Sequence, residues 1–169
     1  LNLPFWWIRA GVYFLIWCGV AFYFHRKSTQ QDRSGDPQIT RRLQRLAPPM
    51  ILLYGLSQTF ASFDWIMSLD PHWFSTMFGV YYFAGSVVAI FAFMALISVG
   101  LRATGALEDV ITPEHYHDLG KYLFAFVVFW AYISFSQYML YWYGNIPEET
   151  LWFAHRWTGS WKTVSVVLG

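Results

Sequence analysis

Long apolar stretches separated by short polar ones dominate the chain. Residues 4–24 contain one ionisable charge, Arg9, and residues 47–69 also contain one, Asp64. Residues 74–101 and 122–147 contain none. Each stretch reaches the ~20 residues that an α-helix needs to cross the hydrocarbon core of a bilayer. Because a backbone in lipid must satisfy its own hydrogen bonds, these stretches are predicted to be membrane-spanning helices.

This pattern predicts an all-α integral membrane protein with an antiparallel transmembrane helix bundle. We expect four full spans, about residues 4–24, 47–69, 74–101 and 118–143, and the start of a fifth near residues 161–169. The connection of residues 70–73 is very short, so the second and third spans should be antiparallel neighbours. We expect residues 1–169 to form one transmembrane helical domain that is a fragment of a longer protein.

Composition narrows the choice of chemistry. Charged residues make up 12% and apolar residues 56%, too little charge for the surface of a soluble domain. The only cysteine, Cys18, excludes an internal disulfide and a four-cysteine metal site. The histidines all fall in loops or at the ends of the apolar stretches: His25, His72, His115, His117 and His155. We therefore expect no haem and no metal on this chain, with a metal site of His115, His117 and Asp118 as a minor alternative. Because the aromatic residues belong to lipid-length stretches, we also expect no nucleic-acid partner.

The basic residues predict the orientation. Eight Lys and Arg residues flank two of the connections: Arg26, Lys27, Arg33, Arg41, Arg42, Arg45, Arg102 and Lys121. Only Arg9, Arg156 and Lys162 fall on the opposite side. The positive-inside rule therefore places residues 25–46 and 102–120 in the cytoplasm and the N-terminal end outside.

Three polar segments carry turn or helix signals. Residues 26–45 are predicted to be a polar loop with a turn at residues 34–37. Thr112 and Pro113 are typical of a helix start, with Thr as the cap and Pro at the first position. Residues 145–161 are rich in aromatic side chains and are expected to form a helix at the membrane surface.

Asp64 is the most informative polar position. A carboxylate inside a span costs about 2.5–3.5 kcal/mol on insertion scales, so it should face protein or trapped water. Helical spacing predicts a polar stripe ending at Asp64, with Gln58 at its border; its members are Tyr54, Ser57, Ala61, Asp64 and Ser68. The stripe is compatible with a proton relay. It is equally compatible with a structural ion pair, since Arg9 and Asp64 both lie about 8 Å inside their spans at 1.5 Å per residue.

The fourth span carries a second polar set. Asp118 and Lys121 mark its cytoplasmic entry beside His115 and His117, whose side chains suit proton capture near neutral pH. Tyr132 and Ser136 follow on one face, and a second face holds Ser134, Gln137, Tyr138 and Tyr141. The alternative is a solvated helix start with a local salt bridge and hydroxyls that join helices.

The third span is rich in small residues. Gly85 and Ala89 are four residues apart, a spacing that lets another helix approach closely. We interpret this span as a packing surface.

Several runs resemble a known family. They are residues 62–81 (SFDWIMSLDPHWFSTMFGVY), 114–121 (EHYHDLGK), 129–132 (FWAY), 135–138 (FSQY) and 145–150 (NIPEET). These runs closely resemble the ActF-type membrane subunit of alternative complex III. That subunit is related to the membrane-anchor family of polysulfide reductase. The resemblance covers nearly all of the chain.

The resemblance implies a subunit of about ten spans in a respiratory complex of the bacterial inner membrane. The complex would pass electrons from quinol through haem c and iron–sulfur subunits to cytochrome c or a terminal oxidase. Quinol would bind mainly in a polysulfide-reductase-like sister subunit, and this chain would be a non-catalytic subunit that conducts protons. The candidate proton path is Ser57, Asp64, Ser68, His72, His117, Asp118, Lys121, Tyr132 and Ser136.

Two alternatives remain open from the residues. In the first, the subunit is purely structural, and Arg9, Asp64 and the hydroxyls only hold helices together. In the second, the chain is an independent secondary transporter; this is weaker, because no span is broken at mid-depth by Gly-Pro pairs.

Overall fold

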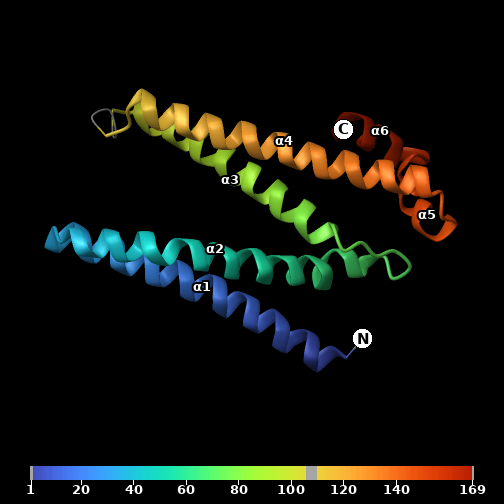
Figure 1. The fold of residues 1–169 in the computed structure, drawn as a ribbon, viewed down its shortest axis with the longest axis horizontal. Helices are drawn as coiled ribbons and strands as arrows, with labels where there is room; N and C mark the ends of the chain where they lie inside the picture. Colours follow the sequence, from blue (N-terminus) through green and yellow to red (C-terminus); the bar gives the residue numbers. More distant parts are fainter. Residues whose placement is uncertain (1, 106–109, 169) are drawn as a thin grey trace. The chain divides into compact units, whose positions relative to one another are not determined.

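The computed structural model describes residues 2–105 and 110–168, and these residues form helices without strands. The elements are α1 (Leu3–Ser34), α2 (Pro37–Trp65), the short 3₁₀ helix η1 (Met67–Leu69), α3 (Phe78–Ala103), α4 (Pro113–Gly144), α5 (Pro147–Arg156) and α6 (Gly159–Leu168) (Figure 1). The predicted all-α class is confirmed for the described residues. The chain divides into two compact units, residues 1–69 and 70–169, which are described separately. That the whole chain forms one domain stays a prediction.

Three of the described helices are long and apolar enough to cross a membrane: α1, α3 and α4. By length and composition, the described helices therefore give three candidate spans and not the predicted four plus the start of a fifth. Helix α2 has the length but not the hydropathy, because Pro48, Pro49 and its polar stripe interrupt the apolar run. Helix α6 has 10 residues and covers most of residues 161–169, where the start of a fifth span was predicted.

The first unit is a hairpin of α1 and α2, which lie side by side in antiparallel order (Figure 1). Gly35 ends α1 in the left-handed conformation, with φ of 64°, and its N–H donates to the carbonyl of Gln31. The carboxylate of Asp36 then caps α2 by accepting from the N–H of Gln38. The turn thus lies within the predicted residues 34–37. The rest of residues 26–45 is helix rather than loop, because both helices continue beyond the apolar stretch to this turn.

The second unit is built on a hairpin of α3 and α4, with α5 and α6 folded back at the far end of α4 (Figure 1). Ala84 is fully buried, and a Cβ atom added to Gly85 would lie 3.1 Å from Nε1 of Trp130 on α4. Helix α4 begins at Pro113 with Thr112 as its N-cap, as predicted. The connection between α3 and α4 includes residues 106–109, which lie outside the described residues.

Apolar side chains cover most of the outer surface of these helices. Leu15 is 75% exposed, Leu96 is 74% and Phe124 is 71%. A soluble protein does not expose so many large apolar side chains over whole helices. The exposed faces of α1, α3 and α4 therefore require a lipid environment, and the chain is a helical membrane protein.

Candidate functional site

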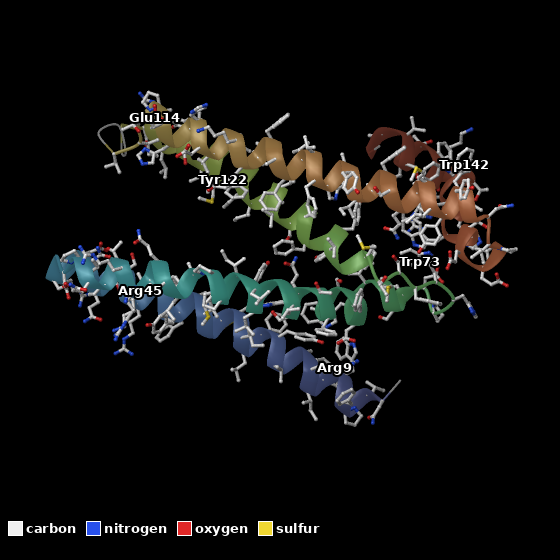
Figure 2. The ribbon with its side chains drawn as sticks, in the orientation of Figure 1. Arg9, Arg45, Trp73, Glu114, Tyr122 and Trp142 are labelled. Atoms are coloured by element: carbon white, nitrogen blue, oxygen red, sulfur yellow. The ribbon has the colours of Figure 1, made fainter. Side chains whose placement is uncertain are left out.

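The candidate site of the first unit lies between one face of α1 and the end of α2. Trp6, Arg9, Tyr13 and Trp17 are spaced three or four residues apart, so their side chains leave α1 on the same side. Each side chain carries an N–H or O–H donor, and each donates to an atom of α2. Arg9 projects from α1 toward the end of α2 (Figure 2).

Asp64 receives two of these donors through its carboxylate. Nη2 of Arg9 lies 2.9 Å from Oδ1, and the hydroxyl of Tyr13 donates to Oδ2 at 2.7 Å. The Asp64 side chain is 13% exposed and Tyr13 is 7% exposed. The structure thus brings together Arg9 and Asp64, as their matching depths predicted, and adds a buried phenol. Both oxygens of the carboxylate are occupied, which offsets the cost of keeping its charge away from water.

The backbone carbonyl of Asp64 is also saturated. It accepts from Nε1 of Trp6 at 3.3 Å and from Oγ of Ser68 at 2.6 Å. Ser68 is exposed and contacts the backbone of Asp64 rather than its carboxylate. Asp64 and Ser68 of the predicted proton path are therefore in contact. The Ser68 hydroxyl donates to the backbone of Asp64, however, and does not extend the path from its carboxylate.

Ser57 lies two turns earlier on α2 and belongs to a separate hydrogen bond. Nε1 of Trp17 donates to its Oγ at 2.9 Å, and that hydroxyl donates to the carbonyl of Tyr54 at 3.0 Å. The rings of Trp17 and Tyr13, which make the two hydrogen bonds, both pack against Trp65. The predicted stripe is thus divided into two separate polar contacts, Trp17 with Ser57 and Tyr13 with Asp64.

The buried polar face of α2 differs slightly from the predicted stripe. Ser57, Gln58, Ala61 and Ser62 are buried, whereas Tyr54 is 39% exposed. Ser62, which the prediction left out, is the most buried of them at 1% and donates to the carbonyl of Thr59. Over residues 51–62, helix α2 therefore buries small and polar residues and exposes large apolar ones.

The predicted cytoplasmic mouth at the start of α4 forms local contacts. Nδ1 of His115 accepts from the backbone N–H of Thr112 at 3.1 Å, so this ring caps the helix. Lys121 and Asp118 form a salt bridge of 3.2 Å in which both side chains are more than half exposed. His117 is exposed. These contacts are those of a solvated helix start, the alternative left open by the sequence.

The remaining path residues are dispersed in the second unit. His72 is exposed in the connection before α3, where its backbone N–H donates to Asp70. On α4, Tyr132 is 63% exposed and Ser136 is half-buried. The neighbouring face of α4 makes the more extensive contacts, since Gln137 donates to Oγ of Ser75 at 2.9 Å and Tyr138 packs against Phe153 of α5.

The part of the chain that the structure describes contains no cluster of side chains that could bind a metal ion. Within residues 2–105 and 110–168, no three His, Cys, Asp or Glu side chains lie close enough together to hold an ion. His115, His117 and Asp118 are included in that range, so the alternative of a metal site there has no geometric support.

Trp6, Tyr13 and Trp17 are the residues of this site that sequence reasoning missed. Their signal was present, because they continue the helical face of Arg9 at intervals of three and four. The helical spacing places these residues on the face of Arg9, but it does not show that their N–H and O–H donors meet acceptors on α2.

Comparison with the models of known protein families and with curated proteins finds no match for this chain.

Proposed function

We propose that this chain is a membrane-spanning part of a respiratory complex that oxidises quinol, and that Asp64 handles protons within it. The proposal takes the complex from the resemblance of residues 62–81 and 114–121 to the ActF-type subunit. Haem c, iron–sulfur clusters and the main quinol site would belong to partner subunits. The basic ends of the hairpins would face the cytoplasm of a bacterium, which agrees with the distribution of Lys and Arg.

The observation that carries the proposal is the Arg9–Asp64–Tyr13 cluster. It combines a carboxylate at low exposure, a phenol whose hydroxyl donates to that carboxylate, and a guanidinium paired with it. Carboxylates inside spans are expensive and are typical of proton pathways in pumps and transporters. Of the predicted path residues, Asp64 is the one that combines burial with charged and hydroxyl partners from another helix.

A purely structural role is the second candidate, and a specific observation favours it. Both carboxylate oxygens are used by α1, and the bonds from Trp6, Arg9 and Tyr13 to Asp64 all join α1 to α2. Such a cluster would hold the hairpin together without moving protons. The two roles predict different results for a substitution that removes the charge of Asp64 but keeps the shape of its side chain.

The discriminating experiment replaces Asp64 with Asn in the purified complex. Quinol oxidation is measured with cytochrome c as acceptor, and proton translocation is measured in proteoliposomes. A proton-handling Asp64 predicts that protons moved per quinol oxidised fall about tenfold or more while oxidation continues, because the amide cannot accept a proton. Tyr13→Phe should lower the same ratio, since it removes the phenol but keeps the ring.

The control is Asp32→Asn, which removes an exposed carboxylate from the polar end of α1 and should leave both measurements unchanged. If Asp64→Asn reduces assembly, oxidation and translocation in parallel, the structural role is correct. If it changes none of them, both roles are wrong. Failure of the complex to co-purify with haem c subunits would reject the respiratory assignment itself.

A further inference from the structure

The second unit contains a cavity that the proposed proton function does not use. It lies beside the end of α4, where α5 and α6 fold back, and its volume is about 620 Å³. Cavities of roughly 300–1,000 Å³ are typical of sites for small molecules. Its walls are largely aromatic and include Trp73, Tyr81, Trp130, Trp152 and Trp161. Figure 2 shows Trp73 among the side chains gathered at this end of the unit.

Arg156 contributes a positive charge to this aromatic wall. Its guanidinium carbon lies 3.2 Å from the ring centroid of Trp152, and Nη1 donates to the carbonyl of Trp152 at 3.0 Å. The salt bridges within residues 2–105 and 110–168 do not include Arg156, so no described carboxylate lies within 4.0 Å of it. Desolvation lowers the pKa of Arg156 below its ordinary value, while the more distant Asp70 raises it to a smaller extent. The cation therefore lacks a direct anionic partner in the described chain.

Trp73 adds a buried donor to the same wall. Its side chain stacks on Trp152 with ring centroids 4.7 Å apart, and the residue is 5% exposed. Its Nε1 is buried and has no hydrogen-bond acceptor among the described residues. A buried N–H without an acceptor is costly, so an oxygen that accepts from it would be favoured. Trp73 and Arg156 thus flank one ring, Trp152, and both favour an oxygen-rich, negatively charged group.

We propose that this cavity binds the phosphate headgroup of a membrane phospholipid. A guanidinium carries five donors in a planar fork that matches phosphate oxygens, and the bond to Trp152 uses only one of them. The aromatic walls suit the glycerol and first acyl carbons of a lipid, since Trp at the ends of spans is typical of the headgroup region. A free phosphate ion would gain nothing from these walls, so a lipid is the occupant that fits both the charge and the apolar lining.

The test measures phospholipid retained by the full complex after purification in detergent, using native mass spectrometry. Delipidated complex is then titrated with dioleoylphosphatidylglycerol and, in parallel, with dioleoylglycerol, which has the same acyl chains but no phosphate. We expect retention of the phospholipid only. Arg156→Gln should weaken it about tenfold, the effect of losing a charge-assisted hydrogen bond. Trp73→Phe should weaken it several-fold while keeping the ring stacked on Trp152.

Lys162→Gln is the matched control, because Lys162 is a nearby exposed cation that does not line the cavity. It should retain phospholipid as the unchanged protein does. Equal retention by unchanged protein, Arg156→Gln and Trp73→Phe would overturn the proposal, as would equal binding of dioleoylglycerol. Displacement of the lipid by millimolar inorganic phosphate would also overturn it, since the site would then recognise a free anion. If Arg156→Gln fails to assemble, the Trp73→Phe result decides.

Discussion

Two ion pairs of similar length occupy very different surroundings in this chain. Arg9 and Asp64 meet at 2.9 Å with the carboxylate 13% exposed, whereas Lys121 and Asp118 meet at 3.2 Å with both side chains more than half exposed. Exposed pairs contribute about 0–1 kcal/mol because water and salt screen them. A pair at low exposure loses much more when one partner is removed, because the other charge stays buried and unpaired.

A double-mutant cycle should separate the two pairs. Arg9→Gln and Asp64→Asn, singly and together, should give a coupling energy of about 1–3 kcal/mol in the free energy of unfolding, as for residues in one network. Lys121→Gln and Asp118→Asn should give less than about 1 kcal/mol. The measurement is unfolding in detergent–lipid micelles followed by circular dichroism. Equal coupling energies in the two cycles would show that the Arg9–Asp64 pair is screened by water as strongly as the exposed Lys121–Asp118 pair.

At the scale of elements, the α3–α4 hairpin depends on a close approach at one glycine. A Cβ at Gly85 would lie 3.1 Å from Nε1 of Trp130, whereas a Cβ at Gly100 of the same helix would meet nothing within 4 Å. A side chain at Gly85 must therefore displace the indole that stacks on Tyr81. This is the contact surface that the small residues of the third predicted span indicated.

Gly85→Leu should lower the free energy of unfolding by about 1–3 kcal/mol, the usual cost of overpacking. Gly100→Leu is the matched control and should be neutral or slightly stabilising, because Leu favours helix more than Gly does. Thermal unfolding of both variants in the same detergent measures the difference. If the two variants unfold at the same temperature, α4 does not pack against α3 at Gly85.

The elements also show what the sequence could and could not specify. Apolar length predicted α1, α3 and α4 well, because a run without charges in lipid must be helical. The prediction of a loop for residues 26–45 was wrong. These residues are polar, but they continue α1 to Ser34 and begin α2 at Pro37. Within the site, the 1.5 Å rise per residue was enough to match Arg9 with Asp64. Hydropathy does not show which face of α1 meets α2, but the match of Arg9 with Asp64 does, and Tyr13 and Trp17 continue that face.

At the scale of the whole molecule, α2 is the helix whose environment needs explanation. Its hydropathy is too low to mark it as a span, yet it packs along α1, which is apolar enough to cross a membrane. The residues that lower its hydropathy include Ser57, Gln58 and Ser62, and these are buried. Over residues 51–60, the residues that α2 exposes are large and apolar, including Leu52 at 66% and Phe60 at 57%. The average over the helix therefore underestimates how apolar its outer surface is.

We expect α2 to lie in the bilayer beside α1, because a polar face turned toward another helix is not exposed to lipid. Single cysteines introduced into a Cys18→Ser background can test this with a membrane-impermeant maleimide applied to both sides of sealed vesicles. Leu56→Cys, on the exposed face of α2, should stay unlabelled until detergent is added. Gln38→Cys, near the polar turn, should be labelled at once from one side. Rapid labelling of both positions would mean that α2 lies in water, and the Arg9–Asp64 pair would then be a surface contact rather than a buried one.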